Sequence, residues 1–461
     1  MIIKIIEPYY RDKRYDIRSS VPSLGPIIVA SLLKKNGHKV EVQTEYVSEL
    51  DFDEINSADL VGISITTYNA TRGYEIAQRI RKPVVFGGFH ASLLPEECLN
   101  YGSYVIRGDG HSIVELADVL SGGKIDGIRE VPNLVYRTDG RVFYNKQETK
   151  SINIVPDFSL VKDYYKLNLN RLLRIPLLVN ASRGCHFNCT FCSIKPIYPD
   201  FKKKDKGIVI EDIKSQLRNQ HFFSKFLPRI IWITDDNFFS DKDWAKDLLR
   251  ELIRLKTGYR FVIQARLDIA NDDNLLKLIE KANIGMISLG IESLNQLSLD
   301  SFNKGSSVKD IGVAVDKIKS HGIDVHGLFV FGDDEFKKGD GLKVAEFVKH
   351  HHLSGLLIQP LTPYPGTPLF KRLDKEGRIL HKNWEDYNGK VVFVPKRVSA
   401  AELHKEIYDC YRSIYSPFRV LKFLIFGKNG FRLIIFGIAI FRYIEWLKSK
   451  NYIREKLSKG E

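Results

Sequence analysis

The chain has 461 residues, of which 44% are hydrophobic, 27% charged and 11% aromatic, so it is long enough for two to four domains with buried cores. Five cysteines, three of them clustered, argue against a disulfide scaffold and favour a metal or catalytic role in a reducing cytoplasm. The net charge of +14 suits nucleic acid, anionic lipid or acidic substrates as partners, and the N-terminus lacks the apolar core of a signal peptide.

Strand-like and helix-like segments alternate through the first 125 residues. Short apolar runs predict strands at 1–8, 39–44, 60–66 and 83–88. Amphipathic patterns predict helices at 25–38, 70–82, 90–100 and 111–123. This alternation predicts a doubly wound, flavodoxin- or Rossmann-like α/β domain with a parallel sheet over residues 1–125.

The predicted strand ends of this domain carry small and polar residues, and ligands of such folds bind at those ends. In chain order they are Ser64, Thr66, Gly87, Gly88, His90, Gly108 and Gly110. Glycine there lets the backbone approach a bulky ligand closely. The Ser/Thr element followed by a Gly-Gly pair resembles a cobalamin-binding domain. The Asp-x-His-x-x-Gly element that supplies a cobalt-ligating histidine is absent, so the resemblance implies either cobalamin without that ligand or loss of the cofactor. His90 then serves as pocket wall or helix cap.

Residues 126–174 are predicted to connect this domain to the next. The segment 133–145 has the pattern of a β-hairpin, with its turn at Asp139-Gly140.

Three cysteines with the spacing C-x3-C-x2-C follow: Cys185, Cys189 and Cys192. Three thiolates on a cluster leave one iron open to a small ligand, whereas a zinc site completed by His186 is the alternative. The spacing, with Phe191 before the third cysteine, resembles the radical S-adenosylmethionine (SAM) enzymes. That resemblance implies a [4Fe-4S] cluster on the three cysteines, whose open iron binds SAM and whose electron cleaves it to a 5′-deoxyadenosyl radical.

Strand and helix patterns alternate again through residues 175–370. The strand candidates are 175–184, 229–236, 261–268, 285–293, 325–333 and 355–369, and the helix candidates are 241–256, 271–282, 308–322 and 341–352. Six strands predict a partial (β/α)6 TIM barrel, which is also the radical SAM fold, with its chemistry at the carboxyl ends of the strands. The lysine-rich segment 201–206 is predicted to be a solvated loop.

Polar residues follow the barrel strands at the expected positions. They are Asp235, Asp236, Gln264, Arg266, Asp268, Glu292, Ser293 and Tyr364, the last within a Pro-Tyr-Pro turn. Helix capping is the alternative for the Asp and Ser residues. The resemblance implies that the acidic pair after the second strand holds the SAM amino group and that Arg266 pairs with its carboxylate. It also implies that Glu292 binds the ribose hydroxyls and that Tyr364 borders the adenine.

The region 371–461 is predicted to be helical, and its end concentrates the positive charge. Residues 415–461 carry ten Lys and Arg against three Glu, half of the net charge of the chain. The apolar run 433–441 is too short to span a bilayer. Basic residues beside aromatic-rich apolar segments predict a helix lying on an anionic membrane, and a cap packed on the barrel is the alternative. Nucleic acid is not expected as a partner, because large aliphatic residues separate the basic ones.

Taken together, the order of the two domains resembles the cobalamin-binding radical SAM enzymes, which implies a [4Fe-4S] cluster, SAM and cobalamin as cofactors. The enzyme is expected to be cytoplasmic and able to reach the inner face of the membrane. Its predicted reaction is methyl transfer to an unactivated carbon of a lipid-like or natural-product substrate, with electrons from a flavodoxin or ferredoxin. The alternatives are a radical rearrangement or cyclisation without methyl transfer, and a non-enzymatic iron–sulfur sensor or scaffold.

Overall fold

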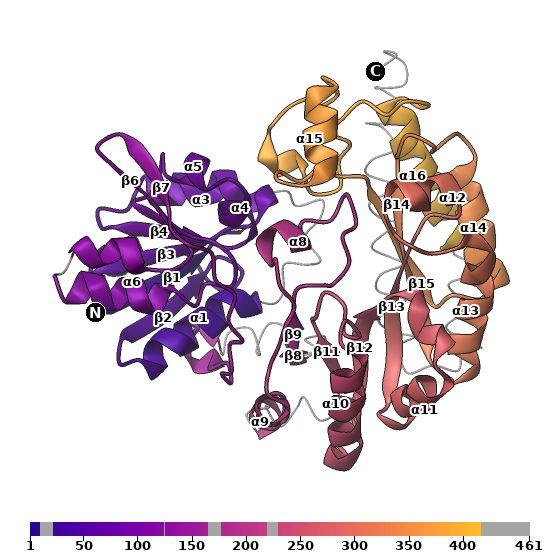
Figure 1. The fold of residues 1–461 in the computed structure, drawn as a ribbon, viewed down its shortest axis with the longest axis horizontal. Helices are drawn as coiled ribbons and strands as arrows, with labels where there is room; N and C mark the ends of the chain where they lie inside the picture. Colours follow the sequence, from indigo (N-terminus) through magenta and orange to yellow (C-terminus); the bar gives the residue numbers. More distant parts are fainter. Residues whose placement is uncertain (10–21, 124, 165–176, 219–228, 416–461) are drawn as a thin grey trace. The chain divides into compact units, whose positions relative to one another are not determined.

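The chain folds into two units, which the computed structural model describes at residues 1–9, 22–123, 125–164, 177–218 and 229–415 (Figure 1). The first unit comprises Met1–His186 and Ser193–Leu227, and the second comprises Phe187–Cys192 and Pro228–Glu461. The boundary between them therefore falls within the cysteine loop.

The first unit is built on a sheet with the strand order β2-β1-β3-β4-β5-β6-β7. Strands β1 to β5 pair in parallel, and the order 2-1-3-4-5 is that of a doubly wound, flavodoxin-like sheet, as predicted. The strands are β1 (Ile2–Glu7), β2 (Lys39–Thr44), β3 (Leu60–Ser64), β4 (Val84–Gly87), β5 (Tyr104–Ile106), β6 (Leu134–Thr138) and β7 (Arg141–Tyr144).

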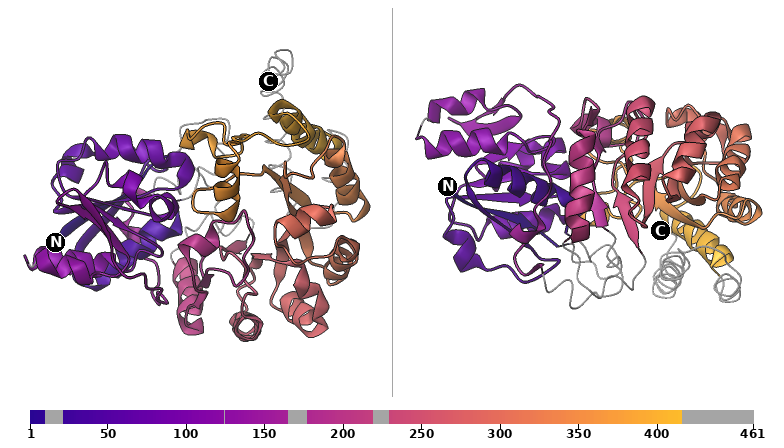
Figure 2. Two further views of the ribbon diagram at one scale, coloured as in Figure 1. Left: turned by 45° about the horizontal axis from the view of Figure 1, so that its top comes forward. Right: turned by 90° about the horizontal axis from the view of Figure 1, so that it is seen from below.

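Helices cover both faces of this sheet. Helices α1 and α6 lie on one face, and α3, α4 and α5 lie on the other (Figures 1 and 2). On the first face, Ile27 and Leu116 pack against strand residues such as Ile3 and Val85 in one buried cluster. The helices are α1 (Leu24–Lys35), α2 (Phe52–Asn56), α3 (Ala70–Ala77), α4 (Phe89–Leu93), α5 (Pro95–Cys98) and α6 (Ile113–Ser121).

The hairpin predicted at 133–145, within the connector, extends the sheet of the first unit. Strand β6 pairs antiparallel with β5, with Tyr136 opposite Tyr104. The predicted turn is confirmed, because Asp139 and Gly140 have φ angles of 49° and 73°, as a tight hairpin turn requires. The sheet is therefore mixed rather than purely parallel, since pairing with β5 satisfies backbone groups that an isolated hairpin would expose.

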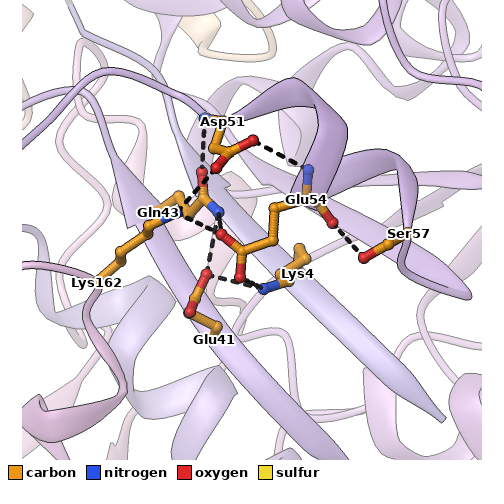
Figure 3. A network of polar contacts seen from close by, with 7 residues as sticks. All are labelled: Lys4, Glu41, Gln43, Asp51, Glu54, Ser57 and Lys162. Carbon is orange, nitrogen blue, oxygen red and sulfur yellow. Dashed lines mark hydrogen bonds and ion pairs between the residues drawn. The ribbon is translucent and has the colours of Figure 1, made fainter.

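A buried lysine organises the β2 edge of the sheet (Figure 3). Lys4, in β1, is only 6% exposed and donates to Glu41 at 2.9 Å and to Glu54 at 2.5 Å. Lys162, near the end of the predicted connector, also binds Glu54, and its amide donates to the peptide oxygen of Val42 at 2.8 Å. These contacts attach the predicted connector to β2 and α2.

The Glu54 network predicts how stability depends on pH. Hydrogen bonds from Lys162 and then Lys4 lower the pKa of Glu54 from 4.5 to about 2. A carboxylate with a lowered pKa stabilises the fold above the unfolded-state pKa, and the contribution disappears as the pH falls towards the folded-state value. After discounting for solvent screening, Glu54→Gln should cost about 1–2 kcal/mol near neutral pH, measured by urea unfolding.

The cost of Glu54→Gln should shrink as the pH falls from 4.5 towards 2. The exposed Glu49→Gln variant is the control and should match the wild type throughout. A cost for Glu54→Gln that stays constant across this range would contradict the assignment of the stabilisation to the Glu54 carboxylate.

All six strands predicted for the barrel are present in chain order. They are β8 (Leu177–Val179), β11 (Ile230–Ile233), β12 (Arg260–Ala265), β13 (Ile284–Glu292), β14 (Asp324–Phe331) and β15 (Gly355–Pro360). In the second unit, β11 to β15 pair in parallel, each with the next. Intervening helices lie along this sheet (Figure 1): α10 (Lys242–Leu255), α11 (Asp273–Lys281), α12 (Gln296–Ser301), α13 (Val308–Ser320) and α14 (Asp340–His350). The predicted partial βα barrel is thereby supported.

The first unit also contains the short elements on either side of the cysteine loop. They are β9 (Ser182–Arg183), α8 (Ile194–Ile197), β10 (Lys202–Lys203) and α9 (Lys206–Arg218). The lysine-rich segment 201–206 was expected to be a solvated loop. It instead forms β10, which pairs with β9, and Lys204 is only 6% exposed.

Two helices follow the last barrel strand: α15 (Pro368–Lys375) and α16 (Ala400–Ile414). The hydroxyls of Tyr411 and Tyr415 accept from the amides of Ile358 and Leu356 in β15, at 2.7 and 3.2 Å. Helix α16 thus satisfies backbone groups at the edge of the sheet, which are otherwise open to pairing with other chains. The predicted membrane-binding segment, 416–461, lies outside the described residues, and no helix within them is long and apolar enough to cross a membrane.

Candidate SAM and cobalamin sites

The second unit holds the latter half of the cysteine loop through backbone contacts. Thr190 donates its amide to Phe302 O and accepts at its own carbonyl from the amide of Leu369, both at 3.0 Å. Asn303 Nδ2 donates to Asn188 O, also at 3.0 Å. These bonds attach the loop both to the turn after α12 and to the start of α15. The loop conformation therefore depends on segments more than 100 residues away along the chain.

Phe191, predicted from the family pattern, adds an apolar contact to this attachment. Its ring meets that of Phe302 edge to face, with centroids 5.0 Å apart, a favoured geometry for aromatic pairs. Phe191 therefore anchors the loop immediately before Cys192.

The five cysteines fall into two classes. Cys98 and Cys410 are buried, and burial raises the pKa of both thiols, that of Cys98 to about 12, which makes them inert. The three loop cysteines form no disulfide and are partly exposed. Thiolates accessible to a ligand are the donors that an iron–sulfur cluster uses, so the donor set fits the predicted group.

The unit boundary separates Cys185 from Cys189 and Cys192. Within the described ranges, no three His, Cys, Asp or Glu side chains are grouped as a metal site. Ligation by the three cysteines therefore remains a prediction from their spacing. His186, which would complete the zinc site of the alternative, is exposed. Its ring packs edge to face on that of Phe201, with the ring centroids 4.9 Å apart.

Arg266, the residue that follows β12, is the buried cation beside this loop. It is 8% exposed, and its Nη1 donates to Cys189 Sγ at 3.6 Å. Its guanidinium lies over the Phe187 ring, 3.6 Å from the centroid, and its Nη2 donates to Lys304 O. The predicted partner of the SAM carboxylate is thus already oriented at the cysteine loop by three contacts.

Glu292, at the end of β13, forms a buried ion pair with Lys304. Lys304 Nζ lies 2.6 Å from Glu292 Oε1, and the two side chains are 5% and 11% exposed. The strand register shifts between Gly290 and Glu292, and Glu292 has a φ of 66°, which is unusual for a residue with a side chain. A Cβ on Gly290 would lie 2.8 Å from both charged atoms, so this pair requires glycine there.

The sequence did not single out Lys304. It follows α12 outside any helical or strand period, and nothing in its neighbours along the chain indicates burial. Only the fold shows that one residue accepts from Arg266 and neutralises Glu292. Arg266, Glu292, Lys304 and Cys189 are therefore linked in one contact network at the strand ends.

The other predicted SAM residues follow barrel strands, except Gln264, which lies within β12. Asp235 is 1% exposed and Asp236 partly buried after β11, and Gln264 O accepts from the amide of Phe238 at 3.0 Å. Ser293 Oγ accepts from the amide of Asn295, the N-cap of α12, at 3.1 Å, and Tyr364 donates to Tyr387 O at 3.2 Å.

The capping alternative does not hold for Ser293 or Asp268, because neither residue caps a helix. Ser293 stabilises the turn that precedes α12, although Asn295 caps the helix. Asp268 lies in a short helical turn and pairs with Lys242 at 2.8 Å. Asp268 is therefore bound at the surface of the unit, whereas Arg266 and Glu292 are buried.

In the first unit, the two glycines that end β4 play different roles. Gly88 has a φ of 91°, and a Cβ there would lie 2.6 Å from Ile65 O and 3.2 Å from Ser64 Oγ. Gly88 is therefore required by the fold. A Cβ on Gly87 would meet nothing closer than Ile106 O at 3.9 Å. The space above Gly87 thus fits close approach by a bulky ligand.

A hydrogen-bonded link joins the β4 and β5 ends. Ser92 Oγ donates to Gly88 O at 2.8 Å and accepts from the amide of Gly108 at 2.9 Å. Gly108 and Gly110 have φ angles of 79° and 81°, which glycine adopts without strain. The next residue, His111, has a buried Nε2 with no hydrogen-bond partner among the described residues.

Thr66 and His90 have structural partners in the same unit. Thr66 and Asn69 form a reciprocal capping box, in which the Thr66 amide donates to Asn69 Oδ1 at 2.7 Å. His90 is fully buried, with Nε2 3.0 Å from the Tyr74 hydroxyl. These contacts fit the role of His90 as pocket wall or cap. The glycine-lined strand ends and the buried His111 nitrogen are compatible with a large polar ligand such as cobalamin.

Three segments of the chain match known protein families. Residues 179–346 match the radical SAM superfamily, residues 15–117 match the B12-binding domain, and residues 367–424 match a domain of unknown function, DUF4070.

Known proteins are similar to this chain along most of its length. Bacteriochlorophyllide d C-12(1)-methyltransferase from Chlorobaculum tepidum is 26% identical, covering 87% of this chain and 84% of the relative. The anaerobic magnesium-protoporphyrin IX monomethyl ester cyclase of Rubrivivax gelatinosus is 25% identical, covering 90% and 77%. The solved structure of the methyltransferase TsrM from Kitasatospora setae, with cobalamin and a [4Fe-4S] cluster bound, shares the fold, with a TM-score of 0.72, 16% identity and coverage of 98% and 99%.

The fold class predicted from the sequence is therefore confirmed, and so are the cofactors that its two domains use: a [4Fe-4S] cluster with SAM in one and cobalamin in the other. The chain thus combines a radical SAM domain with a B12-binding domain, and its similarity to methyltransferases extends along most of its length.

Proposed function

We propose that this enzyme transfers a methyl group to an unactivated carbon of a large, hydrophobic natural-product or lipid-like substrate. The observation that carries the proposal is the union of a B12-binding domain and a radical SAM domain in one chain similar to a methyltransferase along most of its length. When bound, the cluster with SAM supplies hydrogen abstraction and cobalamin supplies the methyl carrier.

The residues of this chain would bind and orient SAM. Arg266 would pair its planar fork with the SAM carboxylate beside Cys189, which it already contacts. Lys304 would hold Glu292 in place as a hydrogen-bond acceptor for the ribose hydroxyls. The nearly buried Asp235 and its neighbour Asp236 would hold the SAM amino group.

The remaining candidates would complete the two sites. Gln264, Ser293 and Tyr364 would border SAM, and the three loop cysteines would ligate the cluster. Ser64, Gly87, Gly108 and Gly110 would lie against the corrin ring.

The proposed substrate class rests on similarity to known enzymes and on the sequence of the C-terminal segment. One relative is named for a bacteriochlorophyllide, a tetrapyrrole. The basic, apolar segment 416–461 remains a predicted contact with an anionic membrane, from which a substrate with an apolar tail could be taken. A flavodoxin or ferredoxin remains the predicted electron donor.

Cyclisation without methyl transfer is the second candidate, because one relative is a cyclase. Anaerobic turnover with SAM deuterated in its methyl group separates the two. Bacteriochlorophyllide d and a polyprenyl lipid serve as probes, and mass spectrometry detects the products. We expect a product heavier by a deuterated methyl group. A product formed with no label would reject methyl transfer in favour of cyclisation.

The Lys304–Glu292 pair predicts a variant that separates folding from SAM binding. Lys304→Met leaves Glu292 buried without its cation and should destabilise the protein by about 3–5 kcal/mol. The double variant Lys304→Met/Glu292→Gln should recover most of that stability, because no buried charge is left unpaired. SAM affinity should stay about ten- to a hundredfold lower, since a charge-assisted hydrogen bond is lost.

Calorimetric SAM titration of the reconstituted protein measures this affinity, and unfolding in urea measures stability. Lys309→Met, on the exposed side of α13, is the matched control and should change neither. A double variant that binds SAM as tightly as the wild type would show that the pair has only a structural role.

The two glycines at the end of β4 predict opposite outcomes. Gly87→Ala should leave the melting temperature unchanged but weaken hydroxocobalamin binding, because its Cβ enters open space. Gly88→Ala should lower the melting temperature itself, because its Cβ would clash with Ile65 O.

Spectroscopic titration with hydroxocobalamin measures binding, and Gly25→Ala, whose Cβ has no neighbour within 4 Å, is the control. Normal binding by a folded Gly87→Ala protein would place the corrin ring elsewhere.

A further inference from the structure

Two like charges face each other in the hairpin around the cysteine loop. Strands β9 and β10 pair antiparallel, with Lys202 directly opposite Arg183. Both side chains are partly buried. Like charges directly opposite each other on neighbouring strands destabilise a sheet, so this pair has an energetic cost that a bound anion would remove.

The facing pair lines a pocket within the first unit. The pocket is small and partly open to solvent. Its lining includes four basic residues and one acidic residue: Lys150, Arg183, Lys202, Lys204 and Asp109. One amide and four hydroxyl-bearing residues complete the polar lining: Asn180, Thr149, Ser151, Ser182 and Tyr198. Donors therefore outnumber anionic groups, as in sites that bind oxyanions.

Two of the four cations already have carboxylate neighbours. Lys150 lies 3.3 Å from Glu115 and 3.6 Å from Glu148. The buried Lys204 interacts electrostatically with Asp212 of α9. These two residues therefore contribute little uncompensated charge to the pocket.

The facing pair has no such compensation. Arg183 Nη1 donates to the peptide oxygen of Asp109, at 3.2 Å, rather than to a carboxylate. Lys202 forms no ion pair with any residue that the structure describes. The Asp109 carboxylate is bound by His111 through Oδ1. Positive charge from Arg183 and Lys202 thus remains available to a ligand.

We propose that this pocket binds the oxyanion of a phosphate or carboxylate group, with Arg183 and Lys202 as its principal donors. Asp109 lies between Gly108 and Gly110 at the end of β5, so the pocket borders the proposed cobalamin site. The oxyanion has two sources under the proposed function: the phosphodiester in the nucleotide tail of cobalamin, or an acidic group of the substrate.

The first experiment needs neither cofactor nor turnover, so it stands apart from the proposed function. The melting temperature of the full chain without corrinoid is measured in inorganic phosphate and in chloride at equal ionic strength. A ligand that binds the native state alone raises this temperature. We expect phosphate to stabilise the wild type and to have no such effect on Lys202→Gln.

In chloride, the direction in which Lys202→Gln shifts the melting temperature distinguishes a ligand site from a structural contact. Lys202→Gln should melt above the wild type in chloride, because the repulsion with Arg183 is gone. Lys203→Gln is the matched control, since this residue is on the same strand and is exposed. It should respond to phosphate as the wild type does. Equal phosphate responses in the wild type and Lys202→Gln would overturn the proposal.

A second experiment identifies the source of the oxyanion. Binding of cobalamin is compared with binding of cobinamide, which lacks the nucleotide tail and its phosphodiester. If the cofactor supplies the group, Lys202→Gln should weaken cobalamin binding about tenfold and leave cobinamide unchanged. Unchanged affinity for both corrinoids, together with a phosphate response, would support the substrate as the source.

Discussion

The candidate SAM site depends on the contacts made by the buried guanidinium of Arg266. It joins a cysteine thiol, an aromatic ring of the cysteine loop and the peptide oxygen of Lys304. Lys304 in turn neutralises Glu292. A buried charge is tolerated only when it is paired and hydrogen-bonded. The loop, the β12 end and the β13 end are therefore coupled, because displacing any one of them would leave a charge unsatisfied.

One position of backbone strain lies within this network. Glu292 adopts a left-handed conformation at a bulge, beside a glycine that cannot accept a side chain. Such conformations persist where the surrounding structure enforces them, and they are frequent at functional sites. In the first unit Gly88 has the corresponding role, since its positive φ and close approach to Ile65 O shape the end of β4. Each unit thus presents a rigid strand end to its proposed ligand.

Periodicity and turn chemistry made most of this fold predictable from the sequence. The barrel strands and the doubly wound order follow from apolar runs that alternate with amphipathic ones, and Asp139-Gly140 correctly indicated a hairpin. The sheet to which that hairpin belongs was not predictable, because pairing between β5 and β6 depends on tertiary contacts. The cysteine spacing indicated the chemistry because it is local, and Arg266 and Glu292 could be identified because they follow strands.

Lys304 and Lys202 were missed for a common physical reason. From sequence alone a lysine is expected to be exposed, because a charged side chain is costly to bury. Lys304 is buried only through its contacts with residues at the ends of β12 and β13. Lys202 lies in a lysine run that indicated a solvated loop, and only the register of β9 and β10 places it opposite Arg183. Charged residues that work through tertiary pairing therefore lie beyond what composition and periodicity can indicate.

The proposed methyl transfer would consume SAM twice, once as the source of the radical and once as the source of the methyl group that cobalamin carries. The most direct measurement is the ratio of two SAM-derived products, 5′-deoxyadenosine and S-adenosylhomocysteine, in anaerobic turnover with a methyl-accepting substrate. The account predicts that both form in equal amounts, one of each per methylated product. Formation of 5′-deoxyadenosine with no S-adenosylhomocysteine would contradict it.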